Sequence, residues 1–306
     1  ALRGILDFAQ EMAPLAADIL PKNWGPKPAV GLLYSWPQAR RRVLDATTPG
    51  KTAAYYAALK YGHCNLRVVP SDRALGPEGL AGLSVLVLGG VRYLEPELVP
   101  VLTAFVQNGG VLVYGEAVPG SDIYGGELSD LPAAATLHEP DAKPSQCAGI
   151  DLRCGVRTVQ PSADTRVLLR DGISRPVLLR RQVGKGRVYV QAADVVGYPL
   201  VALLERVFQD MDATPNWHLL AEIRLVGGSE AAPNVLVSRR SYSDRHALLL
   251  QNRDGYAKDL QLRLPGIGGG WQVSSGLTQR AETVDADGSV RLALGAGDPA
   301  VLIWRR

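Results

Sequence analysis

The 306-residue chain is poor in the residues that thiol and metal chemistry need. It has three cysteines, Cys64, Cys147 and Cys154, too few for a disulfide framework in a protein this size. Cys147 and Cys154 could pair, but isolated thiols in a reducing cytosol are the simpler interpretation. No pair among the four histidines shows metal-ligand spacing; they are His63, His138, His218 and His246. We therefore expect neither a metal nor a cofactor.

Long apolar runs and dense positive charge are also missing. No run approaches the roughly 20 apolar residues of a membrane helix, and no basic segment followed by an apolar one suggests a signal peptide. The net charge of +3 comes from scattered arginines, with Arg40-Arg41-Arg42 the only triplet, whereas a nucleic-acid surface needs a denser basic stripe. We expect a cytoplasmic protein without membrane or nucleic-acid partners. Because the chain starts at Ala1, we also expect it to be processed or to be a piece of something longer.

What the chain does have is hydrophobic content, 46% of its residues, which is typical of a soluble globular protein. The rest of the chain is organised around the segment from Ser84 to Glu116. An apolar run ends at Gly89-Gly90, a helical stripe follows over 95–106, and Val111–Tyr114 is a second apolar run. Continuous apolar strands that alternate with amphipathic helices indicate a parallel sheet covered on both faces. This segment is predicted to be a βαβ unit.

The pattern of strand and helix extends upstream. Strands are predicted over 29–35 and 65–69, with a helix over 51–61 between them. Trp36-Pro37 is interpreted as a strand break before an arginine-rich excursion. The whole alternation predicts an α/β, flavodoxin-like, mostly parallel sheet. Residues 1–28 are predicted to form an N-terminal helix, over 2–20, and a linker; the apolar stripe of that helix should pack against another chain or domain.

The pattern changes after Tyr114. Residues 121–155 are interpreted as an irregular insertion, and Gly184–Gly186 as a hairpin turn between two of four short strands that precede a helix over 198–211. Six further strands without helices predict a small antiparallel β-sandwich; they are 234–240, 246–251, 259–264, 271–274, 289–294 and 300–304. The expected domains are 1–28, an α/β domain over 29–215 and a sandwich over 216–306.

Candidate chemistry lies at the carboxyl ends of the parallel strands, where α/β proteins place their sites. Glu116 directly follows a predicted core strand and is a candidate acid, base or ligand. No second carboxylate, histidine or cysteine supports it at a short fixed spacing, so a solvated loop glutamate is the simpler interpretation. Asp72 is interpreted in the same way, and Asp194 as a residue that caps or orients the helix at Tyr198.

The order of several short segments resembles a known family. Val30–Ser35, Tyr55–Leu59, Leu86–Gly90, Asn108–Val113 and Gly184–Val188 are similar to the glutamine-amidotransferase-like trimerisation domain of glycoside hydrolase family 42 β-galactosidases. Val235–Arg240 and Leu248–Asn252 resemble the C-terminal β-domain of such enzymes. The resemblance covers nearly the whole chain.

This resemblance implies an accessory role. A catalytic TIM barrel carries the glutamates of those enzymes and needs roughly 250 residues, so the barrel is absent from this chain; residues 2–20 look like its last helix. Glu116 stands about where an amidotransferase has its nucleophilic cysteine. The resemblance implies a non-catalytic region that forms a homo-oligomer, a trimer by analogy, or joins a catalytic barrel domain or subunit. Trp36, Ser35, Asp72 and Asp122 are candidates for the rim of a substrate site.

Two alternatives remain open. The chain could be a hydrolase in its own right that uses the loops around Glu116, Asp122 and Trp36. It could also be a sugar- or partner-binding protein without chemistry. The hydrolase alternative predicts a raised pKa at Glu116 in a closed pocket.

Overall fold

The computed structural model describes residues 29–44, 51–76, 78–141, 145–152, 155–211, 218–228, 232–241, 244–265, 267, 271–276 and 281–306. The helix predicted over 2–20, its linker, and Cys154 lie outside these residues. The chain divides into two compact units, one of residues 28–59 and 66–212, the other of 1–27, 60–65 and 213–306. No described helix is long and apolar enough to cross a membrane.

The larger unit is built on a seven-stranded sheet of order β2-β1-β3-β4-β11-β10-β9. Five neighbouring strands are parallel, and β10 and β9 extend the sheet antiparallel. The prediction of a mostly parallel α/β sheet is therefore confirmed. Its strands are β1 (Val30–Tyr34), β2 (Leu66–Pro70), β3 (Val85–Leu88), β4 (Val111–Tyr114), β9 (Arg166–Arg170), β10 (Pro176–Val183) and β11 (Gly186–Gln191).

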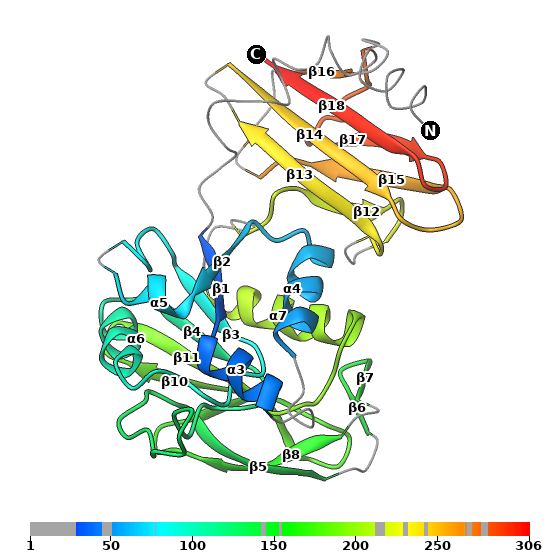
Figure 1. The fold of residues 1–306 in the computed structure, drawn as a ribbon. Helices are drawn as coiled ribbons and strands as arrows, with labels where there is room; N and C mark the ends of the chain where they lie inside the picture. The colour runs from blue at the N-terminus through cyan, green and yellow to red at the C-terminus, as the bar shows by residue number, and fades with distance from the viewer. Residues whose placement is uncertain are drawn as a thin grey trace. The chain divides into compact units, whose positions relative to one another are not determined.

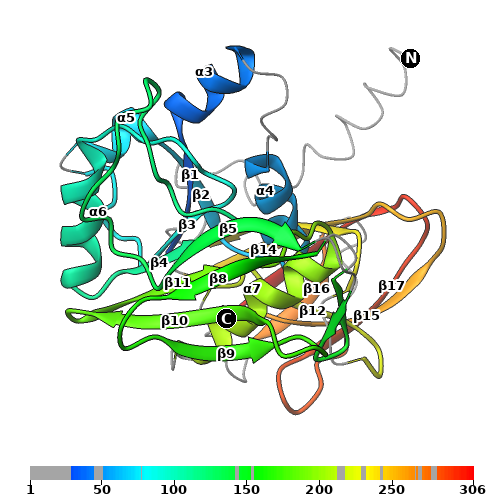
Figure 2. The same cartoon turned by 90° about the horizontal axis from the view of Figure 1, so that it is seen from below.

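Helices cover both faces of this sheet. In Figure 1, α6 (Leu98–Gln107) lies on one face, and α4 (Thr52–Tyr61) and α7 (Tyr198–Asp210) lie on the other; Figure 2 shows the same division from below. Leu86 and Leu88 of β3 join the core under α6, together with Leu102. All four β3 side chains are buried. This two-sided burial is why β3 has a continuous apolar sequence instead of an alternating one.

Strand β1 ends at Tyr34, so the predicted strand break at Trp36-Pro37 is confirmed. The sequence did not predict that the arginine-rich segment after the break is helical: Trp36 begins helix α3 (Trp36–Leu44). A proline in the first turn costs no helical hydrogen bond, and Ser35 Oγ caps the turn by accepting the N–H of Gln38 at 3.2 Å. A further short helix, α5 (Ser71–Ala74), follows β2.

The segment 121–155 is not wholly irregular either. It contains β5 (Ala135–Asp141), β6 (Ser145–Cys147) and β7 (Ile150–Leu152). β5 pairs antiparallel with β8 (Val156–Pro161), with a register shift between Leu137 and Pro140, and such bulges break the alternation by which a strand is recognised in sequence. The start of β8 joins the end of β11, since Arg157 N–H donates to the Ala192 carbonyl at 2.8 Å.

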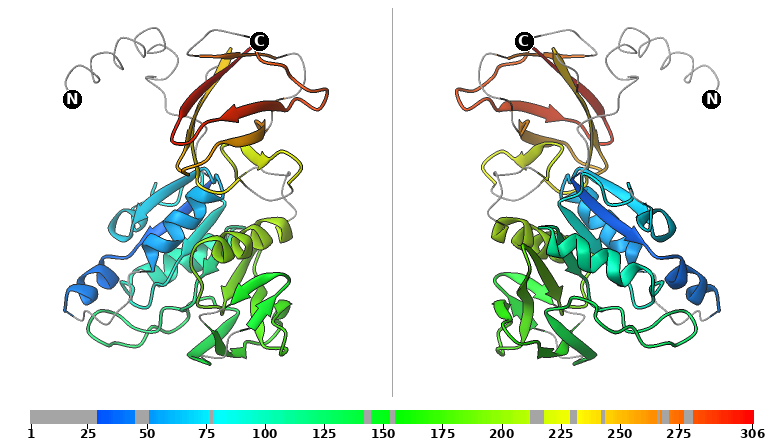
Figure 3. Two further views of the ribbon diagram at one scale, coloured as in Figure 1. Left: turned by 90° about the vertical axis from the view of Figure 1, so that its right-hand side faces the viewer. Right: turned by 90° about the vertical axis from the view of Figure 1, so that its left-hand side faces the viewer.

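The smaller unit is an antiparallel sandwich, shown in two opposite views in Figure 3. One sheet has the order β12-β15-β17 and the other β13-β14-β18-β16. Side chains of both sheets share one core, in which Trp304 is 2% exposed. The strands are β12 (Glu222–Leu225), β13 (Val235–Ser241), β14 (Arg245–Asn252), β15 (Lys258–Arg263), β16 (Gln272–Ser275), β17 (Val290–Leu294) and β18 (Pro299–Arg305). The sequence predicted all of these except β12.

Candidate functional site

The carboxyl ends of β4 and β11 bring two carboxylates together. Because these strands are parallel neighbours, with Tyr114 opposite Val190, the residues that follow them emerge at the same sheet edge. Glu116 follows β4, and Asp194 follows β11. Lys51, the residue before α4, reaches the same edge from the helical layer above it.

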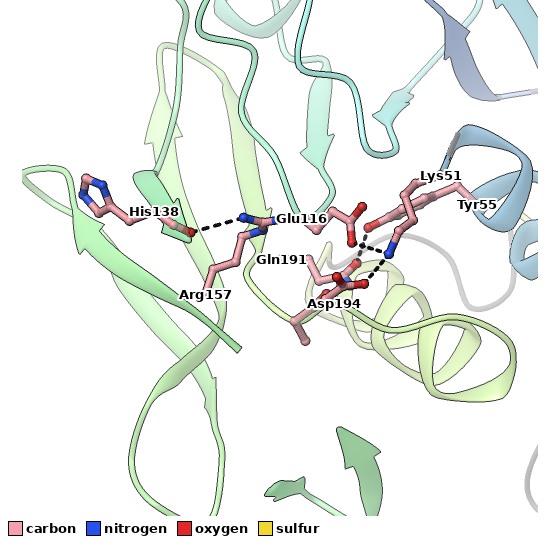
Figure 4. A network of polar contacts seen from close by, with 8 residues as sticks. Lys51, Tyr55, Glu116, His138, Arg157, Gln191 and Asp194 are labelled. Carbon is pink, nitrogen blue, oxygen red and sulfur yellow. Dashed lines mark hydrogen bonds and ion pairs between the residues drawn. The ribbon is translucent and has the colours of Figure 1, made fainter. Parts of the chain in front are cut away.

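Lys51 is held by both carboxylates. Its Nζ lies 3.1 Å from Glu116 Oε2 and also donates to Asp194 Oδ1. Figure 4 shows the ammonium group between the two acidic side chains. The interaction with its two carboxylate partners raises the pKa of Lys51 against the opposing effect of burial. Lys51 therefore carries its charge at neutral pH.

Glu116 is buried, so its interpretation as a solvated loop glutamate is wrong. Only 4% of the residue is exposed. Burial, reinforced by a hydrogen bond to Asp194 and by the charge of Asp194, raises the pKa of Glu116 to about 7, although Lys51 opposes the shift. A carboxyl with this pKa exchanges its proton near neutrality, as general acids and bases do.

Asp194 is the counterpart of Glu116 and not a helix cap. The N-cap of α7 is Gly197, and no side chain caps this helix. Burial would raise the pKa of Asp194, but hydrogen bonds from Lys51 and Glu116 lower it overall, and the Arg157 guanidinium contributes in the same direction. Asp194 stays ionised while Glu116 gains or loses a proton.

Tyr55 on α4 packs against the strand ends beside this pair. Its hydroxyl donates to Gln191 Oε1 at 2.9 Å, and the ring is 1% exposed. A Cβ on Gly115 would lie 2.3 Å from the Tyr55 hydroxyl, and one on Gly89 would lie 2.1 Å from its ring. Glycine at both strand ends is what lets the aromatic ring approach the sheet edge.

Ser35, Trp36 and Asp72 form a separate group at the ends of β1 and β2. The Trp36 indole is 41% exposed, and its Nε1 donates to Asp72 Oδ1 at 3.0 Å. The Tyr34 ring meets the indole edge-on, with centroids 5.0 Å apart. Ser35 Oγ donates to the Tyr93 carbonyl at 2.6 Å. Asp72 is exposed as expected, and the group presents a fixed aromatic side chain to solvent.

The Asp122 carboxylate makes its hydrogen bonds within its own loop, and not to the Glu116 cluster or to the group around Trp36. Its Oδ1 accepts the N–H groups of Tyr124 and Gly126, at 2.7 and 2.8 Å, and so shapes its own loop. Of the five residues proposed from sequence, the structure joins Ser35, Trp36 and Asp72, and places Glu116 with partners that sequence reasoning did not connect to it. Lys51 and Gln191 belonged to no motif, and Tyr55 was noted only as part of the segment Tyr55–Leu59. For Asp194, the available signal was that the ends of neighbouring parallel strands lie at one sheet edge.

The described part of the chain contains no group of three or more His, Cys, Asp and Glu residues arranged to hold a metal ion. Cys64 and Cys147 are buried free thiols. The two carboxylates at the β4 and β11 ends already share the Lys51 ammonium group as a partner, and the chemistry that the pair supports is proton exchange at Glu116.

No protein-family model matches the chain, and no curated protein matches it. Solved structures do match. Gan42B, a GH42 β-galactosidase from G. stearothermophilus, aligns with a TM-score of 0.68 and 14% identity over 92% of this chain and 41% of its own. The chain has the fold of part of a GH42 β-galactosidase. The resemblance inferred from sequence is confirmed at the level of fold.

Two further β-galactosidases agree. The enzyme from Bacillus circulans sp. alkalophilus has a TM-score of 0.69 and 17% identity, over 100% of this chain and 45% of its own. The enzyme from the Antarctic haloarchaeon Halorubrum lacusprofundi has a TM-score of 0.63 and 16% identity, over 96% of this chain and 41% of its own. The chain thus spans less than half the length of each of these three proteins.

Proposed function

We propose that this chain is the non-catalytic, oligomer-forming accessory region of a β-galactosidase-like glycoside hydrolase. The observation that carries the proposal is the extent of the fold match: at least 92% of the chain aligns with each of these three β-galactosidases, yet it accounts for only 41–45% of each. The catalytic TIM barrel would then belong to a further domain or subunit. Each barrel needs roughly 250 residues of its own.

The strand order supports the finer fold assignment within this proposal. In β2-β1-β3-β4-β11 the order reverses at β1, which is the flavodoxin-like arrangement. We assign the larger unit to the amidotransferase-like branch of that fold, with Glu116 about where an amidotransferase has its nucleophile. In this assignment the catalytic thiol has been replaced by a carboxyl group that pairs internally with Lys51.

Trp36 is the residue that the proposal places at a substrate rim. Its indole is exposed yet fixed by Asp72 and Tyr34, so little conformational entropy is lost when another surface covers it. In an oligomer, Trp36 would face the catalytic barrel of a neighbouring subunit. The role of Ser35 is then to cap the first turn of α3, which contains Trp36.

The oligomeric state tests the accessory role directly. We expect light scattering on the purified chain to give a mass that is a multiple of 32.7 kDa, with a trimer as the proposed form. A multiple that persists on dilution supports a specific assembly. A mass of 32.7 kDa at all protein concentrations would contradict self-association through this region.

A second candidate function is hydrolysis at Glu116. The observation in its favour is the buried carboxyl with a pKa of about 7 beside a second carboxylate, a pairing that glycosidases use. It ranks second because Lys51 already engages both carboxylates and because only 4% of Glu116 is exposed. An assay of glycoside hydrolysis by the purified chain separates the two functions, because only the second predicts turnover that depends on Glu116.

A further inference from the structure

Lys51 ties together three segments that are distant in sequence. It lies 65 residues from Glu116 and 143 from Asp194. The first turn of α4 depends on the same residue, because the N–H groups of Ala54 and Tyr55 donate to the Lys51 carbonyl at 2.8 and 3.1 Å. Movement of Lys51 would therefore move the start of a helix.

The turn after β3 is packed against this residue. A Cβ on Gly90, which has a φ of +65°, would lie 2.4 Å from Lys51 Cβ. Thr52 Oγ1 donates to the Gly89 carbonyl at 3.2 Å. The start of α4 is thus held at the sheet edge in two ways. Gly89 and Gly90 contact Thr52 and Lys51, and the two carboxylates bind the Lys51 ammonium group.

Charged and titratable groups reach the cluster from each element around it. Lys51 and Tyr55 come from the α4 segment, Glu116 from the end of β4, and Asp194 from the end of β11. Arg157, on β8, acts on Asp194 through its charge, and its guanidinium donates to the His138 carbonyl at 3.3 Å. With Glu116 ionised the two cations balance the two carboxylates; with Glu116 protonated the cluster carries one positive charge.

We propose that Lys51, Glu116 and Asp194 form a proton-operated latch on the first turn of α4. When Glu116 is ionised, Lys51 is held by two carboxylates. When Glu116 takes up a proton, its carboxyl donates a hydrogen bond to Asp194, and the ammonium group retains one charged partner. The proton moves between solvent and Glu116, and no covalent bond to carbon changes. This inference is independent of the role proposed for the whole chain.

The pH at which Lys51 is held more firmly follows from the linkage between proton binding at Glu116 and release of Lys51. Lys51 lowers the proton affinity of Glu116, so release of Lys51 must raise that affinity. A state that binds protons more tightly is disfavoured as pH rises. The first turn of α4 should therefore be held more firmly above about pH 7 than below it, the range set by the pKa of Glu116.

A pH titration of the unmodified protein tests this first. We expect the ¹³C resonance of the Glu116 carboxyl to titrate near pH 7. Hydrogen exchange at the Ala54 and Tyr55 amides, corrected for its intrinsic pH dependence, should slow as pH rises through the same midpoint. A Glu116 midpoint near 4.5 would overturn the proposal. So would hydrogen-exchange protection at Ala54 and Tyr55 that does not change as pH passes through the Glu116 midpoint.

Two substitutions should move the Glu116 midpoint in opposite directions. Lys51→Met removes the charge that stabilises the ionised form, so the midpoint should rise. Asp194→Asn removes the negative charge that destabilises it, so the midpoint should fall towards 4.5. Asp210→Asn is the control, because Asp210, at the end of α7, pairs with Arg180 of β10 at 2.8 Å, and the midpoint should stay unchanged. Shifts of the same sign in the first two variants would contradict the latch.

Discussion

Burial sets the protonation of single residues in both units, and His63 is the clearest case outside the carboxylate cluster. It is 1% exposed and adopts a φ of 57°, and its carbonyl accepts the Leu220 N–H at 2.8 Å. Burial lowers the pKa of His63 to about 4, and the charge of Lys258 adds to this effect against two backbone hydrogen bonds. His63 is therefore neutral in the folded protein at every pH above about 4.

The neutral His63 makes the smaller unit sensitive to acid. Between the ordinary pKa of 6.5 and about 4, the unfolded chain binds a proton that the folded chain does not, so stability falls as pH falls through this range. We expect His63→Asn, which tolerates a positive φ, to reduce the loss of stability between pH 7 and pH 4 by up to about 3 kcal/mol.

Urea denaturation at the two pH values measures this difference. His138→Asn is the matched control, because His138 is an exposed side chain on β5 and should leave the pH dependence as it is in the unmodified protein. An acid sensitivity that is identical in all three proteins would contradict the assignment to His63.

The sequence predicted what depended on local pattern and missed what depended on long-range contact. Val111–Tyr114 was predicted with the bounds that the structure shows, because a strand buried on both faces is a continuous apolar run. Glu116 was misjudged because the groups that bury and perturb it come from Lys51 and Asp194, on other elements. The strand ends and the start of α4 could be placed along the chain from sequence, but not the position of that helix start over the strand ends in space.

At the scale of elements, glycines at strand ends determine how closely α4 approaches the sheet. Gly115 has no room for a side chain, since an added Cβ would lie 2.3 Å from the Tyr55 hydroxyl and 3.0 Å from the Gly90 nitrogen. The Tyr55 ring is rigidly enclosed, and its hydroxyl is committed to Gln191. Tyr55 cannot give way without loss of this buried hydrogen bond.

Gly115→Ala should therefore displace Tyr55 and destabilise the larger unit by about 2 kcal/mol, the cost of overpacking a filled core. Gly120→Ala is the control, because nothing lies within 4 Å of an added Cβ there. Thermal or urea unfolding measures both. Equal stabilities of the two variants would show that Tyr55 does not pack as described.

At the scale of the whole molecule, two units of different architecture occur in one chain, and together they match less than half of each of the three β-galactosidases. A glycosidase needs two carboxyl groups on either side of the bond it breaks, about 5 to 9.5 Å apart. Glu116 and Asp194 are bridged by one ammonium group. Both carboxylates are therefore engaged in an ion pair within the protein, which stabilises the sheet edge and does not leave them facing a substrate.

An assay for hydrolysis of aryl galactosides and related glycosides by the purified chain decides whether this region has catalytic activity of its own. Our account predicts no turnover above the uncatalysed rate, in the unmodified protein and in Glu116→Gln alike, over the range around pH 7 in which Glu116 changes its charge. Turnover that is present in the unmodified protein and abolished by Glu116→Gln would contradict the account and identify the chain as an enzyme.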